Sequence, residues 1–134
     1  MKYMKEQYKS KITPYNSGKI AEFICRMYMR IHGYRIIAKN YKTGSGRNTP
    51  LGEIDFIAAK KNKIVFCEVK KRKNKNDFLR ALTNKQQIRI KNGAQAFMKK
   101  HKSYKNFSMQ FDVFFVILPF NIRRIKNAIV MNEI

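Results

Sequence analysis

Three acidic residues lie inside two strongly hydrophobic segments of this 134-residue chain. Glu53 and Asp55 belong to the segment 51–59, and Glu68 belongs to the segment 63–70. An unpaired charge among apolar residues is costly, so each of these acids needs a partner or a function. Paired carboxylates can hold a hard divalent cation such as Mg²⁺ or Mn²⁺, or they can form salt bridges with basic residues.

The short polar stretch between the two segments predicts how they pair. Both segments are rich in β-forming residues, and a two-residue hairpin turn at 61–62 places Asp55 opposite Glu68. The same register places Glu53 opposite Lys70. Strand side chains alternate, so these four residues project from one face. Two facing carboxylates repel each other unless a cation lies between them, which predicts a Mg²⁺ or Mn²⁺ site at Asp55 and Glu68.

Lys70 would lie beside this ion, where its ammonium group could hold an attacking water or offset charge on a phosphate. A salt-bridged surface is the alternative, in which Glu53 and Asp55 pair with lysines. The metal interpretation is favoured because the face is otherwise apolar, unlike a solvated one. The apolar residues that share it are Ile57, Ile64 and Phe66.

The composition indicates a folded domain with a polyanionic partner. Lys and Arg number 30 against 8 Asp and Glu, which gives a formal net charge of +22. A hydrophobic content of 44% is enough for a core, so the charge is not that of a disordered basic tail. Nucleic acid is the favoured partner, and an anionic membrane surface is a distant second.

Several classes of protein are excluded by the sequence. No run approaches the roughly 18–20 apolar residues of a membrane span, and the N-terminus has no signal-peptide core. The isolated cysteines Cys25 and Cys67 are interpreted as buried thiols, which indicates a cytoplasmic protein. Two histidines and two cysteines, all far apart, do not form a zinc-binding pattern.

The predicted elements describe an α/β domain in the order α-β-β-β-α-β-β, a mixed sheet flanked by helices. Residues 1–15 are expected to form a mobile basic arm, and residues 16–134 a single domain. Hydrophobic periodicity, cap residues, glycine and proline set the element boundaries. The expected ranges are a helix at 16–32, strands at 34–41, 51–59 and 63–70, a helix at 83–101, and strands at 109–118 and 122–130.

The first helix is apolar around much of its circumference, and it is expected to be well buried. One stripe at helical spacing is formed by Ile20, Ile24, Met27 and Ile31, and Cys25 and Met29 lie towards the other side. Glu22 lies towards the other side of this helix. A lone carboxylate on a buried helix needs a reason.

The pattern of Asp55, twelve residues, then Glu68-Val69-Lys70 resembles the D…(D/E)-x-K signature of the restriction-endonuclease-like nuclease superfamily. Over about residues 16–130 the chain more closely resembles the YraN family of small bacterial proteins. The segments that carry this resemblance are Gly18 with Ala21-Glu22, Gly33-Tyr34, Lys39-Asn40, Gly52-Glu53-Ile54-Asp55, Val65-Phe66-Cys67-Glu68-Val69-Lys70, Lys85 with Arg89-Ile90, and Phe111-Asp112-Val113.

The superfamily resemblance implies a restriction-endonuclease-like fold with a phosphodiesterase site. It implies that Asp55 and Glu68 bind Mg²⁺ or Mn²⁺ and that Lys70 is the catalytic lysine. In many relatives a glutamate on the first helix completes the metal site, which would give Glu22 a catalytic role. Archaeal Holliday-junction resolvases share this layout. Glu53 would support the site or act as an additional ligand.

Basic residues follow the E-x-K strand directly and are expected to contact phosphate at the mouth of the site, although such runs are commonly solvated loops. They are Lys71, Arg72, Lys73 and Lys75. The start of the second helix offers another phosphate contact, because the helix N-terminus adds to the side chains. The residues there are Lys85, Gln86 and Arg89, for which a capped helix start with exposed polar residues is the alternative.

Together, the residues and the resemblance predict a divalent-metal-dependent endonuclease that hydrolyses nucleic-acid phosphodiester bonds, with branched DNA as a candidate substrate. The alternative is a non-catalytic DNA- or RNA-binding module that keeps the nuclease fold. Asp112 is expected to pair with a lysine or arginine and not to bind metal. The strands 109–118 and 122–130 are apolar enough to support a homodimer.

Overall fold

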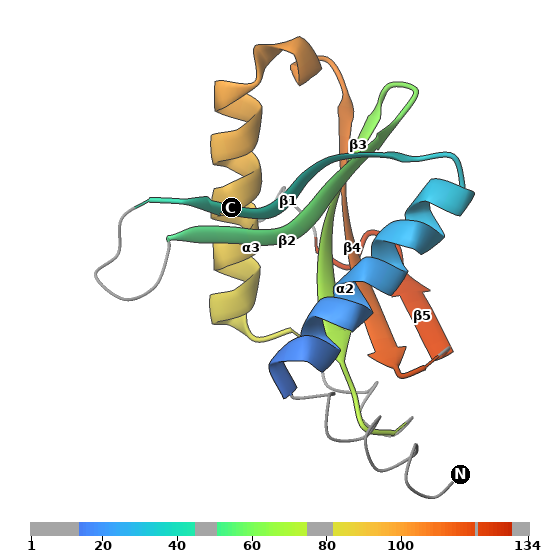
Figure 1. Cartoon of the computed structure of the whole chain (residues 1–134). Helices are drawn as coiled ribbons and strands as arrows, with labels where there is room; N and C mark the ends of the chain where they lie inside the picture. The colour runs from blue at the N-terminus through green and yellow to red at the C-terminus, as the bar shows by residue number, and fades with distance from the viewer. Residues whose placement is uncertain (1–13, 45–50, 75–81, 120, 130–134) are drawn as a thin grey trace, which may run out of the picture.

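The computed structural model describes residues 14–44, 51–74, 82–119 and 121–129 (Figure 1). The predicted arm therefore lies almost entirely outside the described residues. The elements follow the predicted order. They are α2 (Pro14–Ile31), β1 (Arg35–Thr43), β2 (Gly52–Lys60), β3 (Lys63–Lys71), α3 (Asn84–Lys100), the 3₁₀ turn η2 (Lys102–Tyr104), β4 (Ser108–Ile117) and β5 (Asn121–Ile125).

The strands form one mixed five-stranded sheet in the spatial order β1-β2-β3-β4-β5. The first three strands are a meander of antiparallel pairs, whereas β3 and β4 run parallel and β5 returns antiparallel to β4. The parallel pair needs a crossover connection, and α3 lies within it. The hairpin register is the predicted one, since Lys60 pairs with Lys63 and Phe56 with Cys67.

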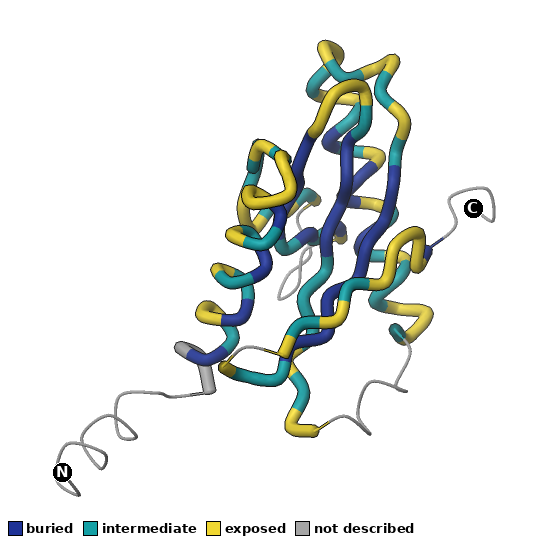
Figure 2. The backbone as a smooth tube through the Cα atoms, turned by 90° about the vertical axis from the view of Figure 1, so that its right-hand side faces the viewer, coloured by how far each residue is buried: buried dark blue, intermediate teal, exposed yellow. Residues whose placement is uncertain are grey.

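The helices α2 and α3 cover opposite faces of the sheet, so the protein has two apolar layers (Figures 1 and 2). Alternation along the strands supplies both layers. On the α2 side the fully buried strand residues include Phe56, Val65 and Phe114. On the α3 side, Phe66 and Phe97 belong to the second cluster. The sheet centre is therefore buried on both faces, which explains the continuous hydrophobic runs in the sequence.

The helix α2 is buried on one side only, whereas the sequence predicted a helix that is well buried around much of its circumference. Ala21, Cys25 and Met29 are fully buried against the sheet, whereas Ile31 is 79% exposed. The rest of the predicted stripe is also largely on the outer side: Ile20 and Met27 are exposed and Ile24 is half-buried. Ala21 and Cys25 are small, so this part of the helix can approach the sheet closely. The prediction of a well-buried helix was wrong because large apolar residues lie on both sides of α2 and only one side packs on the sheet.

The other helix begins as predicted. Thr83 is the N-cap of α3, where its hydroxyl accepts a hydrogen bond from the backbone N–H of Gln86 at 3.1 Å. The side chain of Gln86 accepts in return from the N–H of Thr83 at 2.9 Å. This reciprocal capping box satisfies two backbone donors that the first turn of a helix leaves without partners.

The last strand is shorter than predicted and ends at Ile125. Asn127 adopts a left-handed backbone conformation with φ 54°, and its N–H donates to Asp112 Oδ1 at 3.2 Å. The chain then turns back, so Ile129 is buried in the α3-side cluster. Arg124 of this strand is paired with Asp112, its Nη2 lying 2.6 Å from Asp112 Oδ2. The expected partner of Asp112 is thereby confirmed as an arginine.

Candidate functional site

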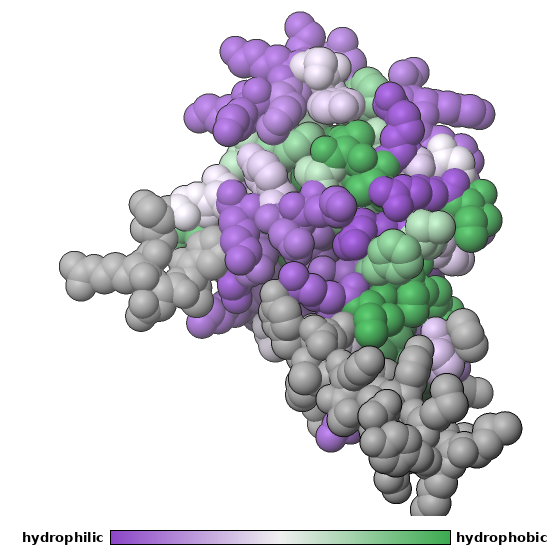
Figure 3. All heavy atoms as spheres, in the orientation of Figure 1, coloured by the Kyte–Doolittle hydropathy of each residue, from purple (hydrophilic) through white to green (hydrophobic). Residues whose placement is uncertain are grey.

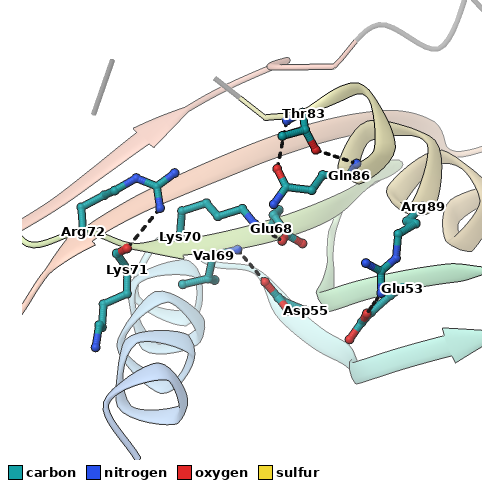
Figure 4. A network of polar contacts seen from close by, with 10 residues as sticks. All are labelled: Glu53, Asp55, Glu68, Val69, Lys70, Lys71, Arg72, Thr83, Gln86 and Arg89. Atoms are coloured by element: carbon teal, nitrogen blue, oxygen red, sulfur yellow. Dashed lines mark hydrogen bonds and ion pairs between the residues drawn. The ribbon is translucent and has the colours of Figure 1, made fainter. Parts of the chain in front are cut away.

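The candidate site lies where β2 and β3 separate. Their ladder ends at the pair Phe56 and Cys67, one position before Asp55 and Glu68. There the Asp55 carboxylate takes the place of a backbone acceptor, and Oδ2 accepts a hydrogen bond from the Val69 N–H at 2.7 Å (Figure 4). The two predicted carboxylates are thus neighbours across a strand opening, and not members of a regular cross-strand pair.

A cavity of about 190 Å³ occupies this opening. Strand residues line one side of it and the first turns of α3 line the other. The lining residues are Glu53, Asp55, Glu68, Lys70, Gln86, Arg89 and Ile90. The structure therefore brings together six of the polar residues that the sequence analysis singled out.

The paired carboxyl groups repel each other inside this cavity. Burial and the neighbouring Asp55 carboxylate raise the pKa of Glu68 to about 8, against the opposing effect of Lys70. Burial also raises the pKa of Asp55, although hydrogen bonds from Val69 and Glu68 oppose that shift. A carboxyl pair of this kind holds a proton near neutral pH because two buried like charges are unfavourable.

Lys70 adds a cation to the pair. Its Nζ lies 3.2 Å from Glu68 Oε1, and the two side chains are only 17% and 16% exposed. An ammonium group this close to a buried carboxylate is held in place by charge as well as by packing. In Figure 4 the Lys70, Glu68 and Gln86 side chains converge on one region between β3 and α3.

Glu53 and Arg89 close the other end of the cavity. Arg89 Nη2 donates to Glu53 Oε2 at 2.8 Å, so this acid pairs with arginine and not with the predicted Lys70. Arg89 Nε is buried and has no hydrogen-bond partner among the described residues. A buried donor of this kind is costly unless a ligand or water accepts from it.

Glu22 lies near the site without lining the cavity. Burial raises the pKa of Glu22, and repulsion from the Asp55 and Glu53 carboxylates raises it further. Glu22 therefore interacts electrostatically with these two carboxylates. Among the described residues, no group of three or more Asp, Glu, His or Cys side chains is close enough to hold a metal ion together. The role of Glu22 as a third ligand stays a prediction.

The basic residues after β3 do not converge on the carboxylates. Lys71 Nζ donates to Ser17 Oγ on α2, and Arg72 Nη1 donates to the Lys71 carbonyl at 3.1 Å. Figure 4 shows the Lys71 side chain pointing away from Asp55 and Glu68, and the Arg72 guanidinium lies 5.2 Å from the centre of the Phe115 ring. Lys75 lies outside the described residues, and Lys85 is exposed on α3 beyond the cavity lining.

Two glycines hold α3 against β2, and sequence reasoning did not assign them this role. A Cβ on Gly52 would lie 2.5 Å from the Gly93 backbone nitrogen, and a Cβ on Gly93 would lie 2.9 Å from Ile54 Cγ1. Asn92 Nδ2 donates to the Leu51 carbonyl at 3.0 Å beside this contact. The close approach sets the position of the α3 residues that face the cavity. The glycine at each of these two positions is the only sign of this close approach in the sequence.

Fold and site define a class: a mixed α/β domain with a carboxylate pair, a lysine and an arginine in one cavity at the opening between two strands. Comparison with known proteins narrows this class. The family model described as "Uncharacterised protein family UPF0102" matches residues 21–116. The chain belongs to the UPF0102 family, which confirms the YraN family expected from its sequence.

Individual relatives agree with this membership. The chain is 35% identical over 106 residues to a UPF0102 protein of Nitrobacter winogradskyi, covering 79% of this chain and 85% of that protein. A UPF0102 protein of Bradyrhizobium diazoefficiens is 36% identical over 106 residues, 79% of this chain and 75% of its own length. A third, from Paramagnetospirillum magneticum, is 34% identical over 99 residues, 74% of this chain and 75% of that protein.

None of the described helices combines the length and the apolar character that crossing a bilayer requires.

Proposed function

We propose that this protein is a divalent-metal-dependent endonuclease of the restriction-endonuclease-like superfamily, acting on nucleic-acid phosphodiester bonds. The observation that carries the proposal is the pair of buried carboxylates beside Lys70 in a cavity of a chain with a net charge of +22. Buried neighbouring carboxylates are costly, and clusters of titratable groups with shifted pKa values are typical of functional sites. DNA, including branched DNA, is the favoured substrate, as the resemblance to archaeal Holliday-junction resolvases implies.

The residues present fit a hard divalent cation. Asp55 and Glu68 are oxygen donors whose pKa values are raised mainly by burial, and the Asp55 carboxylate raises the pKa of Glu68 further. A cation between the two carboxylates would offset both the burial and the repulsion. These two residues would hold Mg²⁺ or Mn²⁺, with Glu22 as the further ligand that the superfamily resemblance implies. When bound, such an ion polarises a phosphoryl oxygen and lowers the pKa of a bound water.

The other residues of the cavity have separate tasks. Lys70 is held by Glu68, so its ammonium group is placed to orient a water or to offset charge that develops on the phosphate. Arg89 is anchored by Glu53 through one nitrogen, while its buried Nε lacks a partner in the described part of the chain. A phosphate oxygen is a suitable acceptor for that N–H. Glu53 therefore acts by positioning Arg89.

Binding of the nucleic-acid backbone fits the charge of the chain. Each phosphate contact by a lysine or arginine releases a counterion, so affinity should fall steeply with salt. Lys71, Arg72 and Lys73 lie just beyond the cavity end of β3, and Lys85 lies at the exposed start of α3. We assign these residues to phosphate contacts outside the cavity, because they do not line it.

A second function, nucleic-acid binding without cleavage, is favoured by one observation. In the part of the chain that the structure describes, no three acidic, histidine or cysteine side chains form a ligand group. A two-carboxylate site with a neighbouring lysine could then be a structural ion pair. This alternative keeps the basic surface and predicts salt-dependent binding, but it predicts no turnover.

Cleavage assays with matched variants separate the two functions. Labelled branched DNA, duplex DNA and RNA are incubated with purified protein in Mg²⁺, Mn²⁺ or EDTA. The endonuclease proposal predicts metal-dependent products that Glu68→Gln and Lys70→Met reduce by at least about a hundredfold. Lys63→Met is the control, since Lys63 lies at the opposite end of the same strand. Absence of cleavage of every substrate, or equal cleavage by Glu68→Gln, would favour the binding module.

A further inference from the structure

The outer side of α2 carries an exposed apolar stripe, formed by Ile20, Phe23, Met27 and Ile31. Their side chains are 39%, 52%, 38% and 79% exposed. Helical spacing places all of them on one side of α2, facing away from the buried face that packs on the sheet. A continuous line of large apolar side chains on a protein surface marks an interaction site more often than scattered exposed residues do.

Basic side chains border this α2 stripe. The Arg26 guanidinium lies 5.9 Å from the centre of the Phe23 ring, and Arg30 Nη1 lies 3.6 Å from Met27 Sδ. Figure 3 shows the same contrast, with hydrophobic and strongly hydrophilic residues side by side over the α2 region. The acid of α2, Glu22, is half-buried near Asp55 and does not belong to this border.

The chemistry of the surface defines the chemistry of its partner. An apolar line with a cationic border is complementary to an amphipathic helix whose apolar line has an acidic border. A second copy of the chain is a poorer match. A two-fold contact centred between Phe23 and Met27 would bring the two copies of Arg26 together, and each copy carries a net charge of +22.

We infer that the α2 stripe is a docking site for an acidic amphipathic helix of another protein. The stripe faces outward, whereas the opposite side of α2 packs on the sheet that supports the catalytic cavity. A partner on α2 therefore leaves the cavity open to a substrate. Docking of this kind would bring the protein to its substrate through a partner, and it does not depend on whether the cavity cleaves nucleic acid.

A designed peptide provides the test. The probe is a fluorescent helical peptide of about 18 residues, or about five turns, with leucines at helical spacing flanked by glutamates. A scrambled peptide of identical composition controls for simple charge attraction at physiological salt. The full-length protein should bind the helical peptide at least about tenfold more tightly than the scrambled one, as measured by fluorescence anisotropy.

Variants of single exposed residues locate the binding. Phe23→Ser should weaken peptide binding by at least about tenfold, because a central aromatic anchor is lost. Ile88→Ser is the matched control: Ile88 is 57% exposed, but it lies on α3. This control should bind like the wild type, and thermal melting verifies that both variants are folded. Equal effects of the two variants, or equal binding of the two peptides, would overturn the inference.

Other occupants of the stripe give different results. A protein dimer in sedimentation that Phe23→Ser dissociates would show that a second copy occupies the stripe. Binding to anionic lipid vesicles that Phe23→Ser abolishes, without peptide binding, would identify a membrane surface. Peptide binding only after removal of residues 1–13 would show that the chain's own N-terminal segment covers the stripe. Each of these outcomes overturns the proposed acidic helix.

Discussion

Substitution of Arg124 should lower the free energy of unfolding more than substitution of any exposed charged residue. Asp112 has a side chain with 0% exposure, and Arg124 has one with 6%. Arg124 Nε donates to Asp112 Oδ2 at 2.7 Å, and Gln110 Nε2 donates to Oδ1 at 2.8 Å. In Arg124→Met, the carboxylate stays buried without its counter-charge. Breaking a buried pair in this way costs about 3–5 kcal/mol.

The measurement is chemical denaturation of purified variants at neutral pH. Arg124→Met keeps an unbranched side chain of similar length, so its packing loss is small. The neighbouring Arg123 is exposed on the same strand, and Arg123→Met should change the free energy of unfolding by no more than about 0.5 kcal/mol. Combining Arg124→Met with Asp112→Asn should recover much of the lost stability, because the uncompensated charge is removed.

The double variant distinguishes a charge effect from a packing effect. If Arg124→Met destabilises no more than Arg123→Met, the pair does not stabilise the junction of β4 and β5. If the cost of the double variant equals the sum of the two single costs, the two side chains are not coupled. Either result would refute the energetic argument for this pair.

Three more predictions follow from burial and close contact. In EDTA, the free energy of unfolding should decrease from about pH 5 to about pH 9. The reason is that the pKa of Glu68 in the folded protein is raised to about 8, so stability is lost as the pH rises through that value. Denaturation curves of Glu68→Gln should show a flatter dependence on pH. Gly52→Ala should cost about 1–3 kcal/mol by pushing α3 from β2, whereas Gly18→Ala, with nothing within 4 Å of the new Cβ, should not destabilise; melting temperatures that shift equally would contradict this. Burial raises the pKa of Cys25 to about 12 and also raises that of Cys67, so neither thiol should react with iodoacetamide near pH 8 until denaturant is added; mass spectrometry would reveal early labelling.

The local chemistry of turns and caps was predictable from the sequence. The two-residue turn set the register of β2 and β3, which the pairing of Lys60 with Lys63 confirms. The N-cap Thr83 was predictable because its hydroxyl can bond the first turn of a helix. These features depend on residues close together in the chain. Sequence reasoning therefore reached them without knowledge of packing.

Features that depend on packing were harder to predict. The helix α2 buries Ala21 and Cys25 while it exposes Ile31, because small residues permit close contact with the sheet. Apolar residues on both sides of the helix predicted burial on both sides, and periodicity alone does not show which side meets the sheet. The separation of β2 and β3 at Asp55 was also not predicted. There the Val69 N–H donates its hydrogen bond to the Asp55 carboxylate and not to a backbone carbonyl of the neighbouring strand. A residue pattern contains no signal for that exchange.

The candidate site was predictable in part. Asp55, Glu68 and Lys70 lie together because alternation in paired strands brings them to one opening. The pairing of Glu53 with Arg89 was not predicted, because it joins a strand to a helix 36 residues further along. The Lys71 side chain points away from the cavity because it is hydrogen-bonded to Ser17 of α2, which is likewise a long-range contact.

Calorimetric titration with Mn²⁺ tests the central claim most directly, because it needs no knowledge of the substrate. The wild type should bind Mn²⁺ at one site, and Glu68→Gln or Asp55→Asn should weaken that binding by at least about tenfold, as loss of a charged oxygen ligand requires. The control Lys63→Met should bind like the wild type. A wild type that binds no Mn²⁺, or variants at Asp55 and Glu68 that bind it equally well, would contradict the account.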